Sequence, residues 1–232
     1  MNEREYEIQE NIKRVKERIY KACQKAGRSP DEITLVGVTK NFPASDIEYA
    51  LKHGIEIAGE NRVQELCEKY EKVHPKQWHL IGHLQKNKVK HIIDKVSLIH
   101  SADSKELIKE IDRQAKKREI VSDILVQVNT SGEETKFGAS PEELDDILFC
   151  ASECKNIRVR GLMTIAPLYV KNVTAMLHFD NTRKLYIDRK ENKYDNISMD
   201  CLSMGMSSDF EEAILCGANM VRVGSAIFGK RA

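Results

Sequence analysis

The regular alternation of short apolar runs with longer amphipathic stretches is the feature that most constrains the fold of this chain. Eight of the apolar runs have the length of strands, and helical patterns separate them. Strands that alternate with helices through short loops form a parallel sheet, and eight such units predict a closed (β/α)8 TIM barrel in the α/β class. The predicted strands are residues 33–40, 56–61, 78–84, 98–101, 124–129, 159–165, 199–203 and 220–224.

A further helix over residues 3–26 precedes the first predicted strand and ends at Gly27, which is typical of a helix C-cap. The other helices are predicted over residues 44–53, 63–72, 87–95, 104–118, 141–154, 173–189 and 209–216. Ser104 offers an N-cap hydroxyl, and Ser140 offers another with Pro141 at the first helical position.

The length of 232 residues fits one barrel and its leading helix, so we expect a single domain over residues 1–232. The alternative is an open doubly wound sheet. It is disfavoured because no glycine-rich dinucleotide turn follows the first predicted strand.

Composition excludes several functional classes. Lysine and arginine number 37 against 36 acidic residues, so the formal charge of +1 provides no general field for nucleic acid. Every apolar run is far shorter than the roughly 20 residues that span a bilayer. Residues 1–5 are polar and no apolar segment follows them, so we expect no secretory signal and a cytoplasmic protein.

The six cysteines are too sparse for a disulfide scaffold, and we expect free thiols in a reducing compartment. Cys150 and Cys154 lie four apart in a predicted helix and raise the question of a metal site. No second cysteine or histidine pair with zinc-site spacing accompanies them, so we interpret them as one face of the helix and predict no metal.

Lys40 ends the first predicted strand, and the active site of a (β/α)8 barrel lies at the C-terminal ends of the strands. Period-two alternation places Lys40 on the same face as Val36 and Val38, which we expect to point into the barrel. Partial desolvation lowers the pKa of such an amine and makes it a nucleophile toward an aldehyde. The alternative is a lysine whose amine reaches solvent at a strand end.

The loops after the seventh and eighth predicted strands are rich in small residues, and this fold often binds phosphate there. They carry Ser203, Gly205, Ser207, Gly224 and Ser225. Backbone N–H groups and hydroxyls of such loops can surround a phosphate, although glycine and serine also mark ordinary turns. Arg222 shares a strand face with Gly224, so its guanidinium is expected to point into the same cavity and to donate to a ring nitrogen.

Several blocks of sequence together resemble the YggS/PROSC family, the pyridoxal phosphate homeostasis proteins. The blocks are residues 59–65 (GENRVQE), 78–88 (WHLIGHLQKNK), 161–165 (GLMTI), 202–207 (LSMGMS) and 221–229 (VRVGSAIFG). The resemblance runs from the first predicted strand to the C-terminus, with the blocks in the order of the family. The combination is far more specific than any single block.

The resemblance implies a barrel similar to the N-terminal domain of alanine racemase that carries pyridoxal 5'-phosphate as a Schiff base. Lys40 matches the family's cofactor lysine, and Arg222 matches the arginine that faces the pyridine nitrogen. Asn61 lies in a motif near the cofactor. The residues that match the phosphate-binding loops are Ser203, Gly205, Gly224 and Ser225. Ser225 stands where many members have threonine, and residues 167–172 lack the commoner proline-rich loop.

Two functions are compatible with this resemblance. Arg222 cannot give a proton to the ring nitrogen, because a neutral guanidinium is inaccessible, and this weakens the cofactor as an electron sink. The resembled racemases also take an opposing tyrosine from a second domain across a dimer, and we expect none here. We therefore favour a cofactor-binding protein that holds, buffers or delivers pyridoxal 5'-phosphate, with apo enzymes that use this cofactor as acceptors and a monomeric state. The alternative is a racemase or related enzyme.

Two other features allow alternatives. A nucleic-acid binding function would rest on the basic run over residues 86–95 alone. Apolar residues are interleaved with the lysines, so we interpret the run as the solvated face of an amphipathic helix. Cys201 lies close to the predicted phosphate loop. Its thiol either has a redox role or is a small buried apolar side chain, and we favour the second interpretation.

Overall fold

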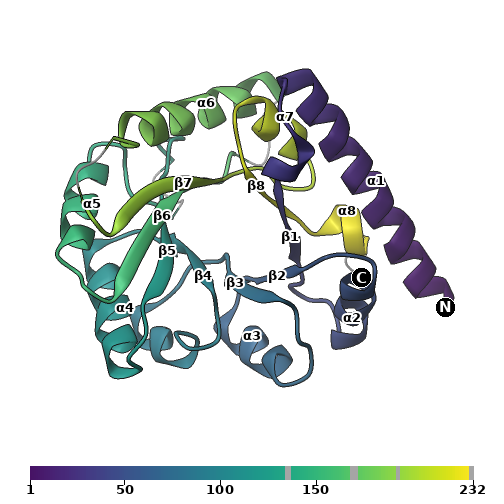
Figure 1. The fold of residues 1–232 in the computed structure, drawn as a ribbon, viewed down its shortest axis with the longest axis horizontal. Coiled ribbons are helices and arrows are strands. Elements are labelled where there is room, and N and C mark those ends of the chain that lie inside the picture. The colour runs from purple at the N-terminus through teal and green to yellow at the C-terminus, as the bar shows by residue number, and fades with distance from the viewer. Residues whose placement is uncertain (134–136, 168–171, 192–193, 230–232) are drawn as a thin grey trace.

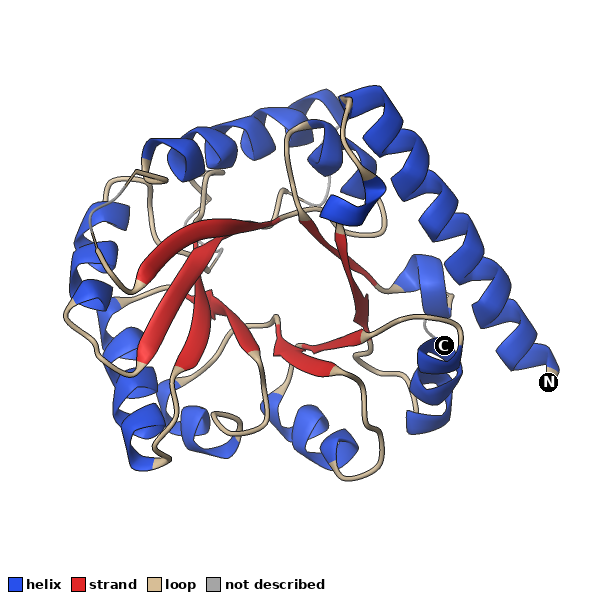
Figure 2. Cartoon of the chain, in the orientation of Figure 1, coloured by secondary structure: helices blue, strands red, loops and turns tan. Residues whose placement is uncertain are grey.

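The strands form a closed parallel barrel, as predicted. The computed structural model describes residues 1–133, 137–167, 172–191 and 194–229. Within these ranges eight strands pair in sequence order and β8 returns to pair with β1 (Figures 1 and 2). The strands are β1 (Thr34–Val38), β2 (Ile57–Glu60), β3 (Gln77–Leu80), β4 (Leu98–Ala102), β5 (Ser122–Gln127), β6 (Ile157–Met163), β7 (Ile197–Ser203) and β8 (Met220–Val223).

Helices surround the strands on the outside of the barrel (Figure 2). They are α1 (Glu3–Ala26), α2 (Ala44–Lys52), α3 (Val63–Tyr70), α4 (Lys105–Lys117), α5 (Leu144–Ser152), α6 (Asn172–Asp188), α7 (Phe210–Leu215) and α8 (Ser225–Phe228), with 3-10 turns η1 (Pro30–Glu32) and η2 (Lys86–His91). The predicted leading helix is α1, which packs against α2, α7 and α8 (Figure 1). Gly27 ends it with a φ of 66°, and the Ser104 hydroxyl caps α4 by accepting from Leu107 N. None of the described helices combines the length and the hydropathy needed to cross a membrane.

Apolar residues occupy both faces of the barrel sheet. The larger cluster joins strand residues to the helices, whereas a smaller one contains strand residues alone and therefore lines the barrel interior. Its members are Val36, Leu98, Leu125, Met163, Cys201 and Met220, with Ile57 packed against them. The predicted inward direction of Val36 is thus confirmed.

Two helix predictions were wrong in detail. The basic run forms the 3-10 turn η2 instead of an α-helix, with Val89 buried beneath exposed lysines, so its solvated character is confirmed but its helix type is not. The helix predicted from Pro141 begins at Leu144 as α5, because the Ser140 hydroxyl and the Glu143 N–H close a separate turn before it. The short α8 was not predicted as a helix. Residues 168–171, within the segment that departs from the family's proline-rich pattern, lie outside the described residues.

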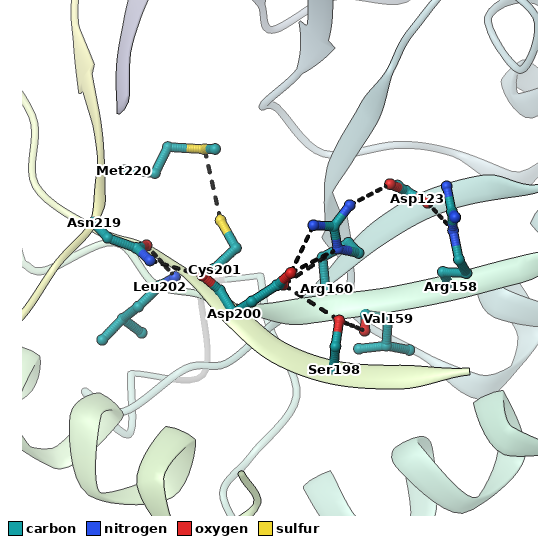
Figure 3. A network of polar contacts seen from close by, with 10 residues as sticks. All are labelled: Asp123, Arg158, Val159, Arg160, Ser198, Asp200, Cys201, Leu202, Asn219 and Met220. Carbon is teal, nitrogen blue, oxygen red and sulfur yellow. Dashed lines mark hydrogen bonds and ion pairs between the residues drawn. The ribbon is translucent and has the colours of Figure 1, made fainter. Parts of the chain in front are cut away.

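Charged side chains link three neighbouring strands, from the start of β5 to the middle of β6 and of β7 (Figure 3). Arg160 on β6 donates to Asp123 Oδ2 on β5 at 2.8 Å and to Asp200 Oδ2 on β7 at 2.6 Å, while Arg158 donates to Asp123 Oδ1. The register of β6 shifts in its pairing with β5 and again in its pairing with β7. The charged contacts bridge the strands at these irregular positions. The charged group therefore stabilises an irregular part of the barrel wall.

Gly161 lies at that irregularity and has a φ of 147°, which side chains rarely adopt. A Cβ at this position would overlap the carbonyl oxygen of Cys201 on β7. We therefore expect Gly161→Ala to lower the free energy of unfolding by about 3 kcal/mol. Gly27→Ala is the control, because its φ is also positive but no atom lies within 4 Å, and it should cost about 1 kcal/mol. Equal midpoints of urea unfolding for the two variants would contradict the prediction.

Candidate functional site

The candidate site lies at the C-terminal ends of β1, β2, β7 and β8. Lys40 is half-buried and follows β1 by two residues. Because β1 pairs with both β2 and β8, Lys40 follows the strand that lies between the two. A Cβ on Gly224 would lie 3.2 Å from both Cβ and the carbonyl oxygen of Val38, so glycine at this position allows the ends of β1 and β8 to approach closely.

The loops after β7 and β8 are joined by one hydroxyl. Ser207 Oγ accepts from Gly224 N at 3.1 Å and from Ala226 N at 3.3 Å. Two backbone N–H groups thus converge on a single oxygen, an arrangement that also suits an oxygen of a phosphate. Gly205 holds the β7 loop with a φ of 91°, and a Cβ there would lie 2.8 Å from Phe210 Cα. Ser225 is exposed at the start of α8.

Arg222 is buried inside the barrel with 3% of its surface exposed. It donates from one terminal nitrogen to Ser203 Oγ at 2.6 Å and from the other to the carbonyl oxygen of Thr164 at 2.9 Å. Burial lowers the pKa of Arg222 to about 10, so the guanidinium remains charged at neutral pH. The side chain of Ser203 therefore serves Arg222, and its hydroxyl is not directed to the phosphate loops as the sequence had suggested.

A chain of buried polar groups continues from Ser203 across the barrel interior. His100 Nδ1 lies 3.0 Å from Ser203 Oγ, and His100 Nε2 lies 3.0 Å from His79 Nδ1. His79 Nε2 in turn lies 3.1 Å from Gln77 Oε1. Burial lowers the pKa of His79 to about 4 and that of His100 well below its usual value, so both rings are neutral at pH 7.

One assignment of hydrogens satisfies every contact in this chain. Ser203 accepts from Arg222 and donates to His100, which donates to His79. His79 then donates to Gln77 Oε1, which can only accept. The order of donors fixes one tautomer for each ring and orients the Ser203 lone pairs toward Arg222. The chain is therefore built to hold the guanidinium in place.

Asn61 follows β2 and lines a groove of about 630 Å³ between α3 and η2, together with His83, Gln85 and Lys88. Asn61 Oδ1 is buried and has no hydrogen-bond partner. A Cβ on Gly82 would overlap the carbonyl oxygen of Asn61, so the turn after β3 packs directly on the Asn61 backbone. The structure thus presents an unsatisfied acceptor near the barrel rim.

The cysteines that raised alternatives have simpler roles. Cys201 is 9% exposed in the interior cluster, and burial raises its pKa to about 12, so the thiol is protonated at neutral pH and unsuited to redox chemistry. Cys150 lies in α5, whereas Cys154 lies two residues beyond its end, so the predicted helix face holds Cys150 alone; Cys154 Sγ donates to the carbonyl oxygen of Cys150. In the described part of the chain, no three histidine, cysteine, aspartate or glutamate side chains lie together as a metal site requires.

Comparison with known proteins gives the family. Residues 7–232 match the family described as alanine racemase, N-terminal domain. A pyridoxal phosphate homeostasis protein of Aquifex aeolicus is 45% identical over 96% of this chain and 97% of its own length. The chain belongs to the YggS/PROSC family. The sequence-based resemblance is thereby confirmed.

Solved structures of relatives agree with the fold. PipY of Synechococcus elongatus, with PLP bound, is 31% identical and superposes with a TM-score of 0.83, covering 96% of this chain and all of PipY. An alanine racemase of Clostridium difficile has a TM-score of 0.74 at 16% identity, and the match covers 97% of this chain but 56% of the racemase. The second likeness concerns the fold alone.

The structure brings Gly205, Arg222 and Gly224 to the barrel end where Lys40 lies, and it places Asn61 at the adjacent rim and Ser225 at the surface. Their contacts with a cofactor stay predictions. The sequence reasoning missed His100 and the direction of Ser203. A signal existed in the sequence, because both histidines are polar residues at inward positions. His79 pairs in register with Leu98 on the neighbouring strand, and His100 follows Leu98 by two residues, so both share the face of this interior residue.

The neutral histidines make stability depend on pH. Unfolded His79 binds a proton near pH 6.5, whereas the folded ring binds one only near pH 4, so stability is retained above pH 6.5 and falls as the pH drops toward 4. The loss should reach about 3 kcal/mol across this window. Urea unfolding measured from pH 7 to pH 4 checks this.

His79→Gln should lower stability at all pH values and should also reduce the slope between pH 6.5 and pH 4. His74→Gln is the matched control, because His74 is exposed, and it should keep the wild-type slope. An unchanged slope in His79→Gln would show that the burial of this ring does not govern the acid sensitivity.

Proposed function

We propose that this chain binds pyridoxal 5'-phosphate covalently through Lys40 and holds, buffers or delivers it within the cell. The observation that carries the proposal is the half-buried Lys40 at the end of β1, beside loops in which the N–H groups of Gly224 and Ala226 converge on one oxygen. The PLP-bound PipY relative, similar over its full length, supports the same ligand.

The residues present fit the chemical groups of this cofactor. A phosphate oxygen can accept from Gly224 N and Ala226 N in place of Ser207 Oγ, and Gly205 and Ser225 flank that position. We assign Arg222 to the ring nitrogen and Ser203 to orienting Arg222. When bound, pyridoxal 5'-phosphate supplies an aldehyde that forms a Schiff base with an amine, which we assign to Lys40. The unsatisfied Oδ1 of Asn61 is available to a donor on the ligand.

Arg222 favours holding the cofactor over catalysis with it. A guanidinium with a pKa of about 10 keeps its proton at neutral pH, so it offers a hydrogen bond to the ring nitrogen without protonating it. An unprotonated ring withdraws electrons weakly, which disfavours reactions that remove a proton from an amino acid. We therefore propose cofactor binding as the function and keep a racemase activity as the alternative.

The finer parts of this function are also proposals. We infer that residues 1–232 act as one cofactor-binding domain, as a monomer, and that apo enzymes which use the cofactor accept it. We assign the protein to the cytoplasm, and its six free thiols support a reducing compartment.

Lys40→Ala should abolish covalent attachment of the cofactor. The purified protein is mixed with pyridoxal 5'-phosphate and its visible absorbance is recorded; borohydride is then added, and the intact mass and the masses of proteolytic peptides are measured. Wild type should retain the reduced cofactor on the peptide that contains Lys40, whereas the variant should lose the visible band and the added mass. Lys72→Ala, an exposed lysine on the C-terminal side of α3, is the control and should behave as wild type.

The same samples separate carrier from enzyme. L-alanine or D-alanine is added to the untreated complex, and the opposite enantiomer is measured over time. A carrier produces none, whereas steady formation of the other enantiomer would favour the racemase. Wild-type protein that retains no cofactor after borohydride would overturn the cofactor assignment itself.

A further inference from the structure

A buried ammonium holds the backbone immediately before Lys40. Lys69 on α3 is 7% exposed, and its Nζ donates to the carbonyl oxygen of Thr39 at 2.7 Å. The same nitrogen donates to Glu60 Oε1 at 2.6 Å and to Glu65 Oε1 at 2.7 Å. Three acceptors therefore match the three donors of the ammonium, which fixes Nζ relative to Thr39.

The backbone immediately after Lys40 is held by the same helix. Asn41 N donates to Glu65 Oε1 at 2.5 Å, and Glu65 lies one turn before Lys69 on α3. Asn41 has a φ of 64°, a left-handed conformation that asparagine adopts more readily than most residues other than glycine. The residues on either side of Lys40 are thus tied to two neighbouring side chains of one helix, and one of these side chains holds a residue with a left-handed backbone.

The third member of this group lies within the barrel wall. Glu60 at the end of β2 is fully buried, and its Oε1 also accepts from Thr39 Oγ1 at 2.6 Å. Burial raises the pKa of Glu60, and its Oε2 has no hydrogen-bond partner. Buried ionic groups contribute little net stability compared with apolar side chains of similar size. Stability alone therefore gives a poor reason for placing this group around the peptide of Lys40.

We infer that Glu65 and Lys69, supported by Glu60, are positioning residues that fix the Lys40 peptide and so direct its amine toward the cofactor aldehyde. The inference rests on the proposed function. In the step concerned, Lys40 Nζ forms a bond to the aldehyde carbon, and the aldehyde oxygen leaves as water with the two amine hydrogens. The rate of such a condensation depends steeply on how the amine is oriented. None of these residues enters the bond change itself.

The test separates attachment from binding. Glu65→Ala, Glu65→Gln and Lys69→Met are compared with wild type, and Lys72→Met is the control that removes an exposed lysine near the end of the same helix. The rate of covalent attachment is followed by visible absorbance after mixing with pyridoxal 5'-phosphate, and borohydride trapping confirms the site. Affinity is measured with pyridoxine 5'-phosphate, which has an alcohol in place of the aldehyde.

We expect Glu65→Ala and Lys69→Met to slow attachment by roughly tenfold or more while the affinity for pyridoxine 5'-phosphate stays within about twofold. Glu65→Gln should attach the cofactor nearly as fast as wild type, because its amide oxygen still accepts from Asn41 N. Lys72→Met should match wild type in both measurements. If Lys69→Met does not fold, the inference is tested by comparing the attachment rates of Glu65→Ala and Glu65→Gln.

Two results would overturn the inference while leaving the proposed function intact. One is attachment within about twofold of wild type in the Glu65→Ala variant. The other is a parallel loss of attachment rate and analogue affinity, which would mean that the whole site had moved and not the lysine alone. Wild-type protein that attaches no cofactor would instead overturn the proposed function, and this inference with it.

Discussion

The pairing of β1 with β8 is the constraint on which the candidate site depends. It closes the sheet and places the first strand of the barrel beside the last, so that Lys40 and Gly224 lie on neighbouring strand ends although they are far apart in sequence. The close approach of Gly224 to Val38 shows how little space separates the two ends. An open sheet with the same strands would leave Lys40 and the loops after β7 and β8 on opposite edges.

Two polar groups are built into this barrel at different depths. The chain from Arg222 to Gln77 crosses the interior through neutral side chains, and it fixes the direction of one cation. The group around Lys69 lies between β2 and α3 and fixes backbone on both sides of Lys40. In each case a buried charge is surrounded by acceptors, which limits the cost of desolvation.

The sequence was sufficient to predict the barrel, because eight apolar runs and intervening helical patterns leave few other topologies. The sequence also placed Lys40 at a strand end, on the face of Val36, by period-two alternation, and the role of Lys40 as the cofactor lysine stays a prediction. It failed where the answer depends on a neighbouring strand or helix. The direction of Ser203 is set by Arg222 and His100 on other strands, and the role of Lys69 is set by a carbonyl oxygen some thirty residues earlier. The η2 turn was mispredicted because periodicity alone does not distinguish 3-10 from α geometry.

The hydroxyl of Ser207 has a consequence for how tightly any anion can be held. Gly224 N and Ala226 N already have an acceptor supplied by the chain itself. A phosphate that takes its place exchanges one set of hydrogen bonds for another, so its affinity reflects a difference between two acceptors and not the full strength of new contacts. Departure of the anion leaves no donor stranded, since the serine can return. Such a loop favours reversible binding of its ligand over permanent retention.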